Sequence, residues 1–423
     1  MSCGSRHRLN EPNRVTYTEV NTMRLTLLRR NAAVLATCLL GAYLIGCGPK
    51  ARKAEGHMDD PPTHYKQGMK YWDAGEYAKA EEEFNHAKDL DPKYAPAYAG
   101  LALVTAQKAM TAKTTDETED LFEEANDLAD KAQSLDGEIP EVYIAKALVL
   151  TMEHEGQPAD EWLDDVEKQY TKALKIDPDN AEAYFRRGYC YKKAYQFSKA
   201  AADFRKVLDL NKDFTQQADK EWELVQKIER AAPGTDVGKK IALVEKISRA
   251  DVAALYVSEL KIDKLVDKKR EKTHDTDFEA PDDPREMKTE EVVKAEKVTD
   301  IDSHWAKNFI MDIVDLRIRG LEPYPDHTFH PQELINRGEF AMMVEDALIV
   351  IMGDESLATK HIGTESRFPD VNPSHPAYNA VCNAIDRDIL DAQMNGEFGL
   401  DQPVSGPDAL LAIRKLKDLN KIE

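Results

Sequence analysis

Apolar and polar residues follow one another along residues 62–231 with the period of paired amphipathic helices. In the segment 64–92, small and aromatic residues recur at spacings of 3, 9, 4, 3 and 5, at Gly68, Tyr71, Ala80, Phe84, Ala87 and Pro92. The segment 184–210 repeats the first four spacings 120 residues later, at Gly188, Tyr191, Ala200, Phe204 and Val207. Small residues let two antiparallel helices approach closely, and aromatic rings fill the groove between them. The spacing therefore predicts a series of helical hairpins.

Two longer copies of this hairpin are expected between the first and the last. Their helices would cover residues 98–107 and 123–137, and then 143–152 and 166–180. A polar helix at 216–231 would cap the series. The whole pattern resembles the tetratricopeptide repeat, and the resemblance implies about four repeats and a capping helix over residues 62–231.

This resemblance also implies a concave groove that binds an extended peptide or a helix of a partner protein. By helical spacing, the first helix of each repeat would present to the groove Tyr65, Met69, Trp72, Ile144, Leu148, Phe185, Tyr189, Lys192 and Lys193. Helical spacing leaves a second interpretation open, in which these side chains pack against the neighbouring repeats. The sequence does not identify the partner.

Residues 298–352 predict a different unit, formed by a helix, a turn and a second helix. Asp302 or Ser303 is expected to cap the first helix, and Gly320 to end it. The buried face of this helix would consist of Trp305, Phe309, Ile310, Ile313 and Leu316. Because Trp305 lies on that face, its indole is expected in the core.

Three motifs of this unit resemble the S-layer homology domain: "DIDSHWA" at 300–306, "PYPDHTFHP" at 323–331 and "INRGEFA" at 335–341. The resemblance implies a helix–loop–helix fold, of which three copies usually assemble around a pseudo-threefold axis. It further implies grooves between the copies that bind cell-wall carbohydrate, either pyruvylated polymers or peptidoglycan.

Two degenerate copies flank the unit at 298–352. The first, at 235–265, keeps Arg249 in "SRAD" but shows no first helix, and a charged linker at 266–297 follows it. The last, at 366–420, has Pro376 in place of the tryptophan and Gly406 in place of the arginine. The expected fold class is therefore all-α, a solenoid of tetratricopeptide type followed by helix–loop–helix S-layer homology repeats.

The second resemblance implies a set of residues that bind the cell wall, namely Arg337, Arg249, Trp305, Glu339 and Asp302. A planar guanidinium makes bidentate hydrogen bonds to a carboxylate, and an indole stacks on a sugar face. The alternative is that each arginine pairs with Asp251, with Glu339 or with a neighbouring copy. The family's glycine is replaced by His327, which would be strained if the loop requires a positive φ.

The N-terminal region predicts export and lipidation. Residues 1–46 contain Met23 as the expected start, a basic stretch and an apolar run that is short for a membrane span. The end of the run, Leu44-Ile45-Gly46-Cys47, resembles the lipobox of bacterial lipoproteins and implies a lipid on Cys47. Residues 47–61 would form a tether, and an ordinary signal peptide or a single anchor helix is the alternative.

Composition narrows the classes of function. The net charge of −21 argues against nucleic acid as a partner. Cys190 and Cys382 have no spacing typical of a zinc site, and the sequence gives no metal or cofactor. The usual nucleophile, zinc-protease and nucleotide-binding motifs do not occur, so we expect no enzyme.

The sequence therefore predicts a scaffold or tether of the cell envelope. A lipid at Cys47 would hold the membrane, and Gly48 after it is compatible with the outer membrane if the cell has one. The repeats would bind a protein, and the C-terminal copies would bind the wall. The alternative is an adaptor for a secretion or outer-membrane complex, in which the C-terminal copies have a structural role only.

Overall fold

The computed structural model describes residues 51–54, 56, 58–155, 159–269 and 298–422. The expected signal, Cys47 and most of the 266–297 linker lie outside these residues. The described residues form helices joined by turns, together with two isolated β-bridges, Ser248–Leu334 and Asn336–Pro403. The all-α fold class is thus confirmed. The chain divides into two compact units, Met1–Glu153 and His154–Glu423.

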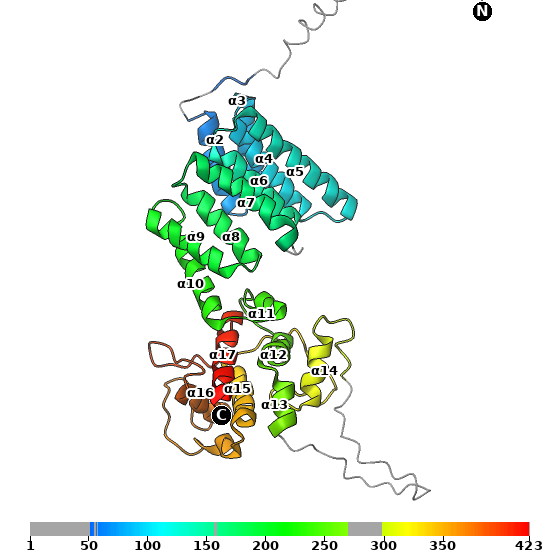
Figure 1. The fold of residues 1–423 in the computed structure, drawn as a ribbon, viewed down its shortest axis with the longest axis vertical. Helices are drawn as coiled ribbons and strands as arrows, with labels where there is room; N and C mark the ends of the chain where they lie inside the picture. Colours follow the sequence, from blue (N-terminus) through cyan, green and yellow to red (C-terminus); the bar gives the residue numbers. More distant parts are fainter. Residues whose placement is uncertain (1–50, 55, 57, 156–158, 270–297, 423) are drawn as a thin grey trace, which may run out of the picture. The chain divides into compact units, whose positions relative to one another are not determined.

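The first unit contains helical hairpins (Figure 1). Its helices are α2 (Pro61–Asp73), α3 (Tyr77–Leu90), α4 (Ala95–Ala109), α5 (Thr115–Leu135) and α6 (Pro140–Glu153). Helix α2 packs on α3, and α4 packs on α5. Asp60 caps α2, because its carboxylate accepts a hydrogen bond from Thr63 N at 3.0 Å.

One aromatic ring explains a glycine on α2 and a glycine on α4. The Phe84 side chain is fully buried, and a Cβ atom added at Gly68 or at Gly100 would lie 2.5 Å from its ring. Glycine is therefore required at both positions for the helices to approach this closely. Helix α4 is buried on almost every side, as expected for a helix that is apolar all round.

The second unit begins with the remaining helices of the repeat array. These are α7 (Ala159–Ile176), α8 (Ala181–Lys193), α9 (Phe197–Leu210) and α10 (Thr215–Ala231). Helix α8 packs on α9 with the Phe204 ring against Gly188, and α10 packs on α9. Helix α10 also packs against α17 at the C-terminus, where Lys227 forms an ion pair of 2.5 Å with Asp408.

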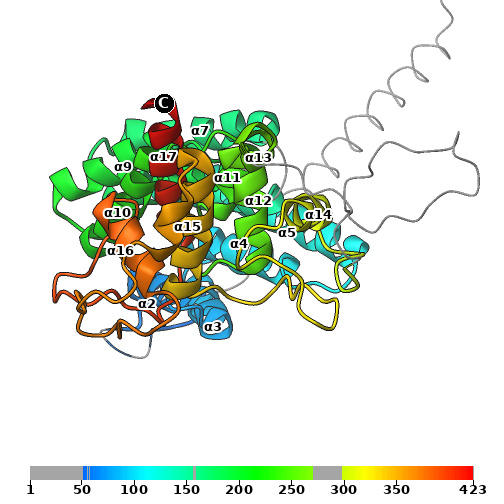
Figure 2. The same cartoon turned by 90° about the horizontal axis from the view of Figure 1, so that it is seen from below.

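The rest of the second unit forms a bundle of short helices. In chain order they are α11 (Asp236–Ile241), α12 (Arg249–Leu255), the π-helix η2 (Tyr256–Leu260), α13 (Ile262–Lys269), α14 (Lys307–Asp315), α15 (Arg337–Met352), the 3₁₀ helix η4 (Glu355–Thr359), α16 (Tyr378–Asp386) and α17 (Gly406–Ile422). Figure 2 shows α15 beside α17, and these two helices pack on each other. Helix α15 also packs on α16, and α12 packs on α14.

A closed ring of three backbone hydrogen bonds joins the segments that precede α12, α15 and α17. Ile247 N donates to Val404 O at 2.9 Å, Ile335 N to Ile247 O at 3.0 Å, and Val404 N to Ile335 O at 3.2 Å. Each residue of the ring lies two positions before the first residue of its helix. This cyclic pattern is the pseudo-threefold relationship that three helix–loop–helix copies would give.

Candidate functional site

All three nitrogens of the Arg249 guanidinium donate hydrogen bonds to the loop of the next copy. Its Nε donates to Phe329 O at 2.9 Å, Nη1 to Gly320 O at 2.8 Å, and Nη2 to Glu322 O at 2.9 Å. The group lies 4.7 Å from the centre of the Phe329 ring, and the residue is only 7% exposed. Arg249 therefore joins α12 to the loop before α15, which corresponds to the alternative of pairing with a neighbouring copy.

Arg337 makes the same kind of contact with the last copy. Its Nε donates to Phe398 O at 2.9 Å and its Nη2 to Asp391 O at 2.6 Å, with the guanidinium 4.6 Å from the Phe398 ring centre. Burial lowers the pKa of Arg337, and the charges of Asp408, Asp391 and Asp370 oppose this. The residue is half-buried, and Nη1 has no hydrogen-bond partner among the described residues.

No arginine can occupy the third position, for a steric reason. Gly406 N donates to Val244 O at 2.8 Å, and a Cβ atom at Gly406 would lie 1.8 Å from Ile241 O. Helix α11 and the turn after it thus fill the space that an arginine side chain would need. The glycine noted in the sequence is a consequence of this close backbone approach.

Each of the two complete loops is held by an aspartate. Asp300 accepts hydrogen bonds from Phe329 N and His330 N, both at 2.8 Å. Asp370 does the same for Phe398 N at 2.8 Å and Gly399 N at 2.7 Å. These roles were not predicted from the sequence, although both copies have an aspartate about 29 residues before a phenylalanine.

Positive φ angles in these loops agree with the expected strain at His327. The φ of His327 is +63°, and its counterpart Gly396 has +82°. His330 has +54°, and its counterpart Gly399 has +74°. The loop therefore requires the left-handed conformation at both positions, and this chain adopts it with histidine in one copy and glycine in the other.

Trp305 lies on the surface, contrary to the expectation that its indole packs in the core. It is 56% exposed, and its ring contacts Phe309 edge-on at 6.3 Å between centroids. The reason is that α14 begins only at Lys307 after Ala306, so Trp305 precedes the helix whose apolar face it was assigned to. Ile310 and Ile313 of that face are fully buried, as expected.

Asp302 and Glu339 have local roles. The N-cap of α14 is Ala306, so the expected caps Asp302 and Ser303 are not used. Asp302 instead lies 2.8 Å from Lys307 Nζ on the surface. Glu339 forms a capping box, in which its carboxylate accepts from Asn336 N at 3.0 Å.

Trp305 and Arg337 belong to different junctions among the described residues. Trp305 precedes α14, and its neighbour His304 lies 2.8 Å from Gln332 Nε2 in the loop held by Arg249 and Asp300. Arg337 contacts residues 391–402 of the last copy, where Pro376 replaces the tryptophan. The residues expected to bind the wall are therefore distributed over two junctions between copies.

The expected groove residues of the first unit are mostly packed. Tyr65, Met69 and Trp72 are partly buried and pack against the core of α3 and α4. Leu148 packs against the core of α4 and α5, and Ile144 is only 3% exposed. These contacts correspond to the interpretation of packing between repeats.

The expected groove residues of the second unit differ in exposure. Phe185 stacks on Phe214 with 4.9 Å between centroids, whereas Tyr189 is 38% exposed. Lys192 Nζ lies 4.4 Å from the Tyr189 ring centre and pairs with Glu221 at 2.5 Å. Lys193 pairs with Glu155. Tyr189 and Lys193 are thus the more accessible members of this set, whereas Lys192 is largely covered.

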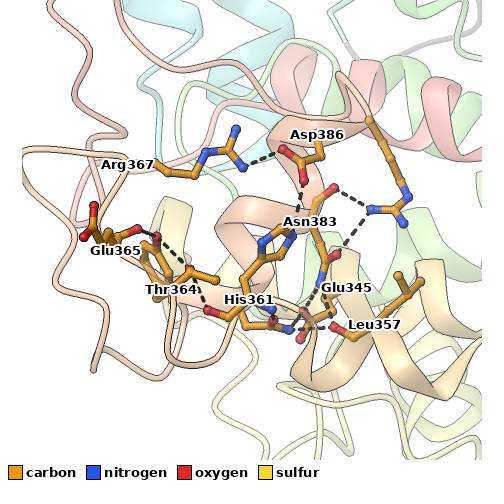
Figure 3. Close-up of polar contacts among 11 residues, drawn as sticks. Glu345, Leu357, His361, Thr364, Glu365, Arg367, Asn383 and Asp386 are labelled. Atoms are coloured by element: carbon orange, nitrogen blue, oxygen red, sulfur yellow. Dashed lines mark hydrogen bonds and ion pairs between the residues drawn. The ribbon is translucent and has the colours of Figure 1, made fainter.

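A buried polar network connects the second and third copies (Figure 3). The Glu345 carboxylate accepts from Asn379 Nδ2 at 2.5 Å and Asn383 Nδ2 at 2.8 Å. Arg319 Nη1 lies 3.2 Å from the same carboxylate. Burial raises the pKa of Glu345, while Asn383, Arg319 and Asn379 act in the opposite direction. Both asparagines also donate to Leu357 O, so η4 is fixed on α16.

Further observations concern metals, membranes and thiols. In the part of the chain that the structure describes, no group of His, Cys, Asp or Glu side chains is arranged to hold a metal ion. Among the same residues, no helix combines the length and apolar character needed to cross a membrane. Cys190 and Cys382 are both buried, in agreement with the expectation for small apolar side chains.

The fold consists of a helical repeat array followed by helix–loop–helix copies whose loops are held by Arg249 and Arg337. We call these copies, from residue 235 to residue 420, the trefoil. Family models match the chain at both parts: tetratricopeptide repeat at residues 61–94 and 169–202, and S-layer homology domain at residues 299–341 and 367–409. The chain thus carries tetratricopeptide repeats followed by S-layer homology domains, as the sequence motifs predicted. The copy at 235–265 lies outside the matched ranges.

Solved structures of tetratricopeptide proteins are similar to part of the chain. A thermophilic protein of Thermus thermophilus is 17% identical, with 40% of this chain and 83% of that chain covered and a TM-score of 0.33. Yeast Tom70 is 20% identical, with 44% of each chain covered and a TM-score of 0.24. YrrB, described as a protein with an unusual peptide-binding site, is 21% identical over 39% of this chain and 94% of its own, with a TM-score of 0.19. No curated protein matches the sequence.

The two families set the general function. Tetratricopeptide repeats are scaffolds for interactions between proteins, and S-layer homology domains attach proteins to the cell surface. Both families typically bind rather than catalyse. The chain therefore combines an interaction scaffold with a module of the cell surface or envelope.

Proposed function

We propose that the chain is a lipid-anchored scaffold of the cell envelope. The lipid on Cys47 holds the N-terminus in a membrane, which is the outer membrane in a cell that has one. The trefoil binds sugars of the wall, and the repeats bind a protein partner. Several acyl chains give stable attachment, since each buried CH₂ contributes about 0.8 kcal/mol, and weak wall contacts gain from the high local concentration.

The exposed indole of Trp305 carries the proposal for the wall. An indole that is 56% exposed has lost the packing that a core tryptophan would have, and a flat apolar face suits the apolar face of a sugar ring. The arginines fit an anionic ligand less well, because the Arg249 guanidinium already donates hydrogen bonds to three backbone carbonyl groups. We therefore favour peptidoglycan sugars over a pyruvylated polymer.

Sedimentation with purified sacculi tests this assignment. The wild-type protein is expected to pellet with sacculi whether or not their attached polymers have been removed. Trp305→Ala should weaken binding about thirtyfold, the effect of losing a tryptophan worth about 2 kcal/mol. Met311→Ala is the matched control, because Met311 is also exposed and lies on α14. Equal binding by both variants would refute the role of Trp305.

The proposal for the protein partner rests on Tyr189 with Lys192 and Lys193. Tyr189 is 38% exposed, whereas the Lys192 side chain is largely covered and pairs with Glu221. The ion pair between Lys193 and Glu155 joins two partly exposed side chains. Exposed ion pairs contribute little to stability, so an acidic group of a partner can replace Glu155 as the counter-ion of Lys193. Tyr189→Ala is expected to reduce partner binding while α8 keeps its helix by circular dichroism.

The adaptor is a second candidate, and two observations favour it. Gly406 has no room for a side chain, and α10 of the repeat array packs directly on α17 of the trefoil. In this case the trefoil would only support the repeats. Failure of the wild-type protein to pellet on either kind of sacculus would select this function.

A further inference from the structure

The chain shortly after the expected lipid site is fixed to the first helical hairpin. Arg52 N donates to Asp89 O at 2.6 Å, which attaches the backbone to the end of α3. The guanidinium of Arg52 binds the Asp59 carboxylate through two hydrogen bonds, Nη1–Oδ2 at 3.0 Å and Nη2–Oδ1 at 2.5 Å. A bidentate pair of this kind has a defined geometry, unlike most surface ion pairs.

The imidazole of His64 connects Asp59 to α3. Its Nε2 lies 2.9 Å from Asp59 Oδ1, and its Nδ1 lies 2.6 Å from Glu83 Oε2. Ionised carboxylates only accept hydrogen bonds, so both contacts are hydrogen bonds only when both ring nitrogens carry a proton. This geometry requires the imidazolium form.

We infer that protonated His64 links the Arg52–Asp59 pair to helices α2 and α3, and that loss of its proton breaks this link. We call the group of Arg52, Asp59, His64 and Glu83 the clasp, which is closed when His64 is protonated and open when it is not. When the proton leaves, one ring nitrogen presents a lone pair to a carboxylate, and the contact becomes repulsive. The link from Asp59 through the imidazole to Glu83 is then broken, so the pair of Arg52 and Asp59 is no longer fastened to α3 through its side chains.

The charges around His64 set the direction of the pH dependence. From the N-terminal segment Arg52 and Asp59 face it, and from α3 come Glu83 and His86, whose ring centroid is 5.3 Å away. Burial lowers the pKa of His64, but hydrogen bonds and charges from Glu83 and Asp59 outweigh it, and the pKa is raised above 6.5. The clasp is therefore complete below pH 6.5 and is lost as the pH rises through the raised pKa.

The clasp has a consequence for the anchor, which rests on the lipidation of Cys47 proposed above. The five residues from Cys47 to Arg52 span at most about 18 Å in any conformation. With the clasp closed, the first hairpin is thus held within this distance of the membrane surface. With the clasp open, the Arg52 N–Asp89 O hydrogen bond still holds this segment on α3, and once that bond breaks the chain as far as the Asp60 cap adds to the reach of the anchor.

Limited trypsin digestion of the full chain in detergent tests the clasp. The bonds after Arg52 and Lys53 are followed by mass spectrometry at pH 6 and pH 9, and each rate is divided by that of a free peptide of residues 48–60. We expect the native chain to be cleaved more slowly than the peptide at pH 6, because the closed clasp keeps this segment on α3. At pH 9 the two rates should converge.

Variants separate the clasp from general stability. His64→Gln should be cleaved rapidly at both pH values, whereas His86→Gln should behave as the wild type. If circular dichroism shows that His64→Gln melts the hairpin, Asp59→Asn, which lies before α2, replaces it and should also be cleaved rapidly. Wild-type ratios that are equal at the two pH values, or protection in both variants, would overturn the clasp. Cys47→Ser should leave all ratios unchanged, so failure of the lipid anchor is detected separately by loss of membrane association.

Discussion

Arg249 and Phe329 form the contact on which the trefoil is built, with the guanidinium Nε 2.9 Å from the Phe329 carbonyl oxygen and stacked on its ring. The pair of Arg337 and Phe398 repeats the same distance of 2.9 Å one copy later. In each pair an aspartate holds the amide of the same phenylalanine. Both the backbone N–H and the backbone C=O of Phe329 and of Phe398 are thus hydrogen-bonded, which makes the loops rigid parts of the fold.

Replacing Arg249 should therefore destabilise the protein. Arg249→Ala leaves three backbone carbonyl groups without their charged donor, and we expect a loss of about 4 kcal/mol in the free energy of unfolding. Urea denaturation followed by circular dichroism measures it. Arg414→Ala is the control, because its pair with Asp418 is exposed and should contribute under about 0.5 kcal/mol. Equal midpoints for the two variants would contradict a structural role.

The sequence predicted most of the fold because its strongest signals are local. Glycine and aromatic spacing located the helical hairpins, since Gly68 and Phe84 must meet for two helices to approach. The motifs around Trp305 and Arg337 located the copy at 298–352, and the aspartate start and the histidine before an amphipathic helix located the last copy. Local signals cannot show whether a guanidinium is free for a ligand, because the carbonyl groups that occupy Arg249 lie more than 70 residues away.

The position of Trp305 could not be predicted either. Helical periodicity predicted that Trp305 lies on the buried face. This periodicity applies only to residues within a helix, and α14 begins two residues after Trp305. The clasp at His64 was also not predicted, because its carboxylates come from two separate segments. For Trp305 the sequence does not show where the helix begins. For His64 it does not show which other segments contribute the carboxylates.

The third junction should not accept an arginine. Gly406→Ala places a Cβ atom 1.8 Å from Ile241 O, so α11 or α17 must move, and we expect a loss of about 3 kcal/mol in the free energy of unfolding. Gly406→Arg should be at least as destabilising and should not increase binding to sacculi. Thermal unfolding provides the measurement, with Lys415→Ala on the same helix as the control. A Gly406→Arg variant that is stable and binds more tightly would show that the space is open.

The loop conformation gives two substitutions with opposite effects. Gly396 has a φ of +82° and no atom within 4 Å of an added Cβ, so Gly396→Ala isolates the backbone cost and should destabilise by about 1 kcal/mol. His327→Gly at φ +63° should relieve the same strain and stabilise the fold by up to about 1 kcal/mol. Gly396→Asn, which tolerates this conformation, is expected to lie between glycine and alanine. Urea midpoints in the opposite order would exclude a left-handed loop.

The buried carboxylates Glu345 and Glu259 predict opposite dependences of stability on pH. Burial raises the pKa of Glu345, so its contribution is complete below pH 4.5 and is lost as the pH rises through the raised value. For Glu259, burial acts to raise the pKa, but hydrogen bonds from Thr235 and Lys417 outweigh it, and the lowered pKa gives stability that is lost as the pH falls. Glu345→Gln keeps an acceptor for Asn379 and Asn383, so it should remove the loss of stability that the wild type shows as the pH rises above 4.5. Glu259→Gln should instead reduce stability at pH 7, and this variant should lose less stability than the wild type as the pH falls. Unfolding midpoints at pH 4, 5, 6 and 7 distinguish the two, and a Glu345→Gln profile parallel to that of the wild type would show that this carboxylate is not the titrating group.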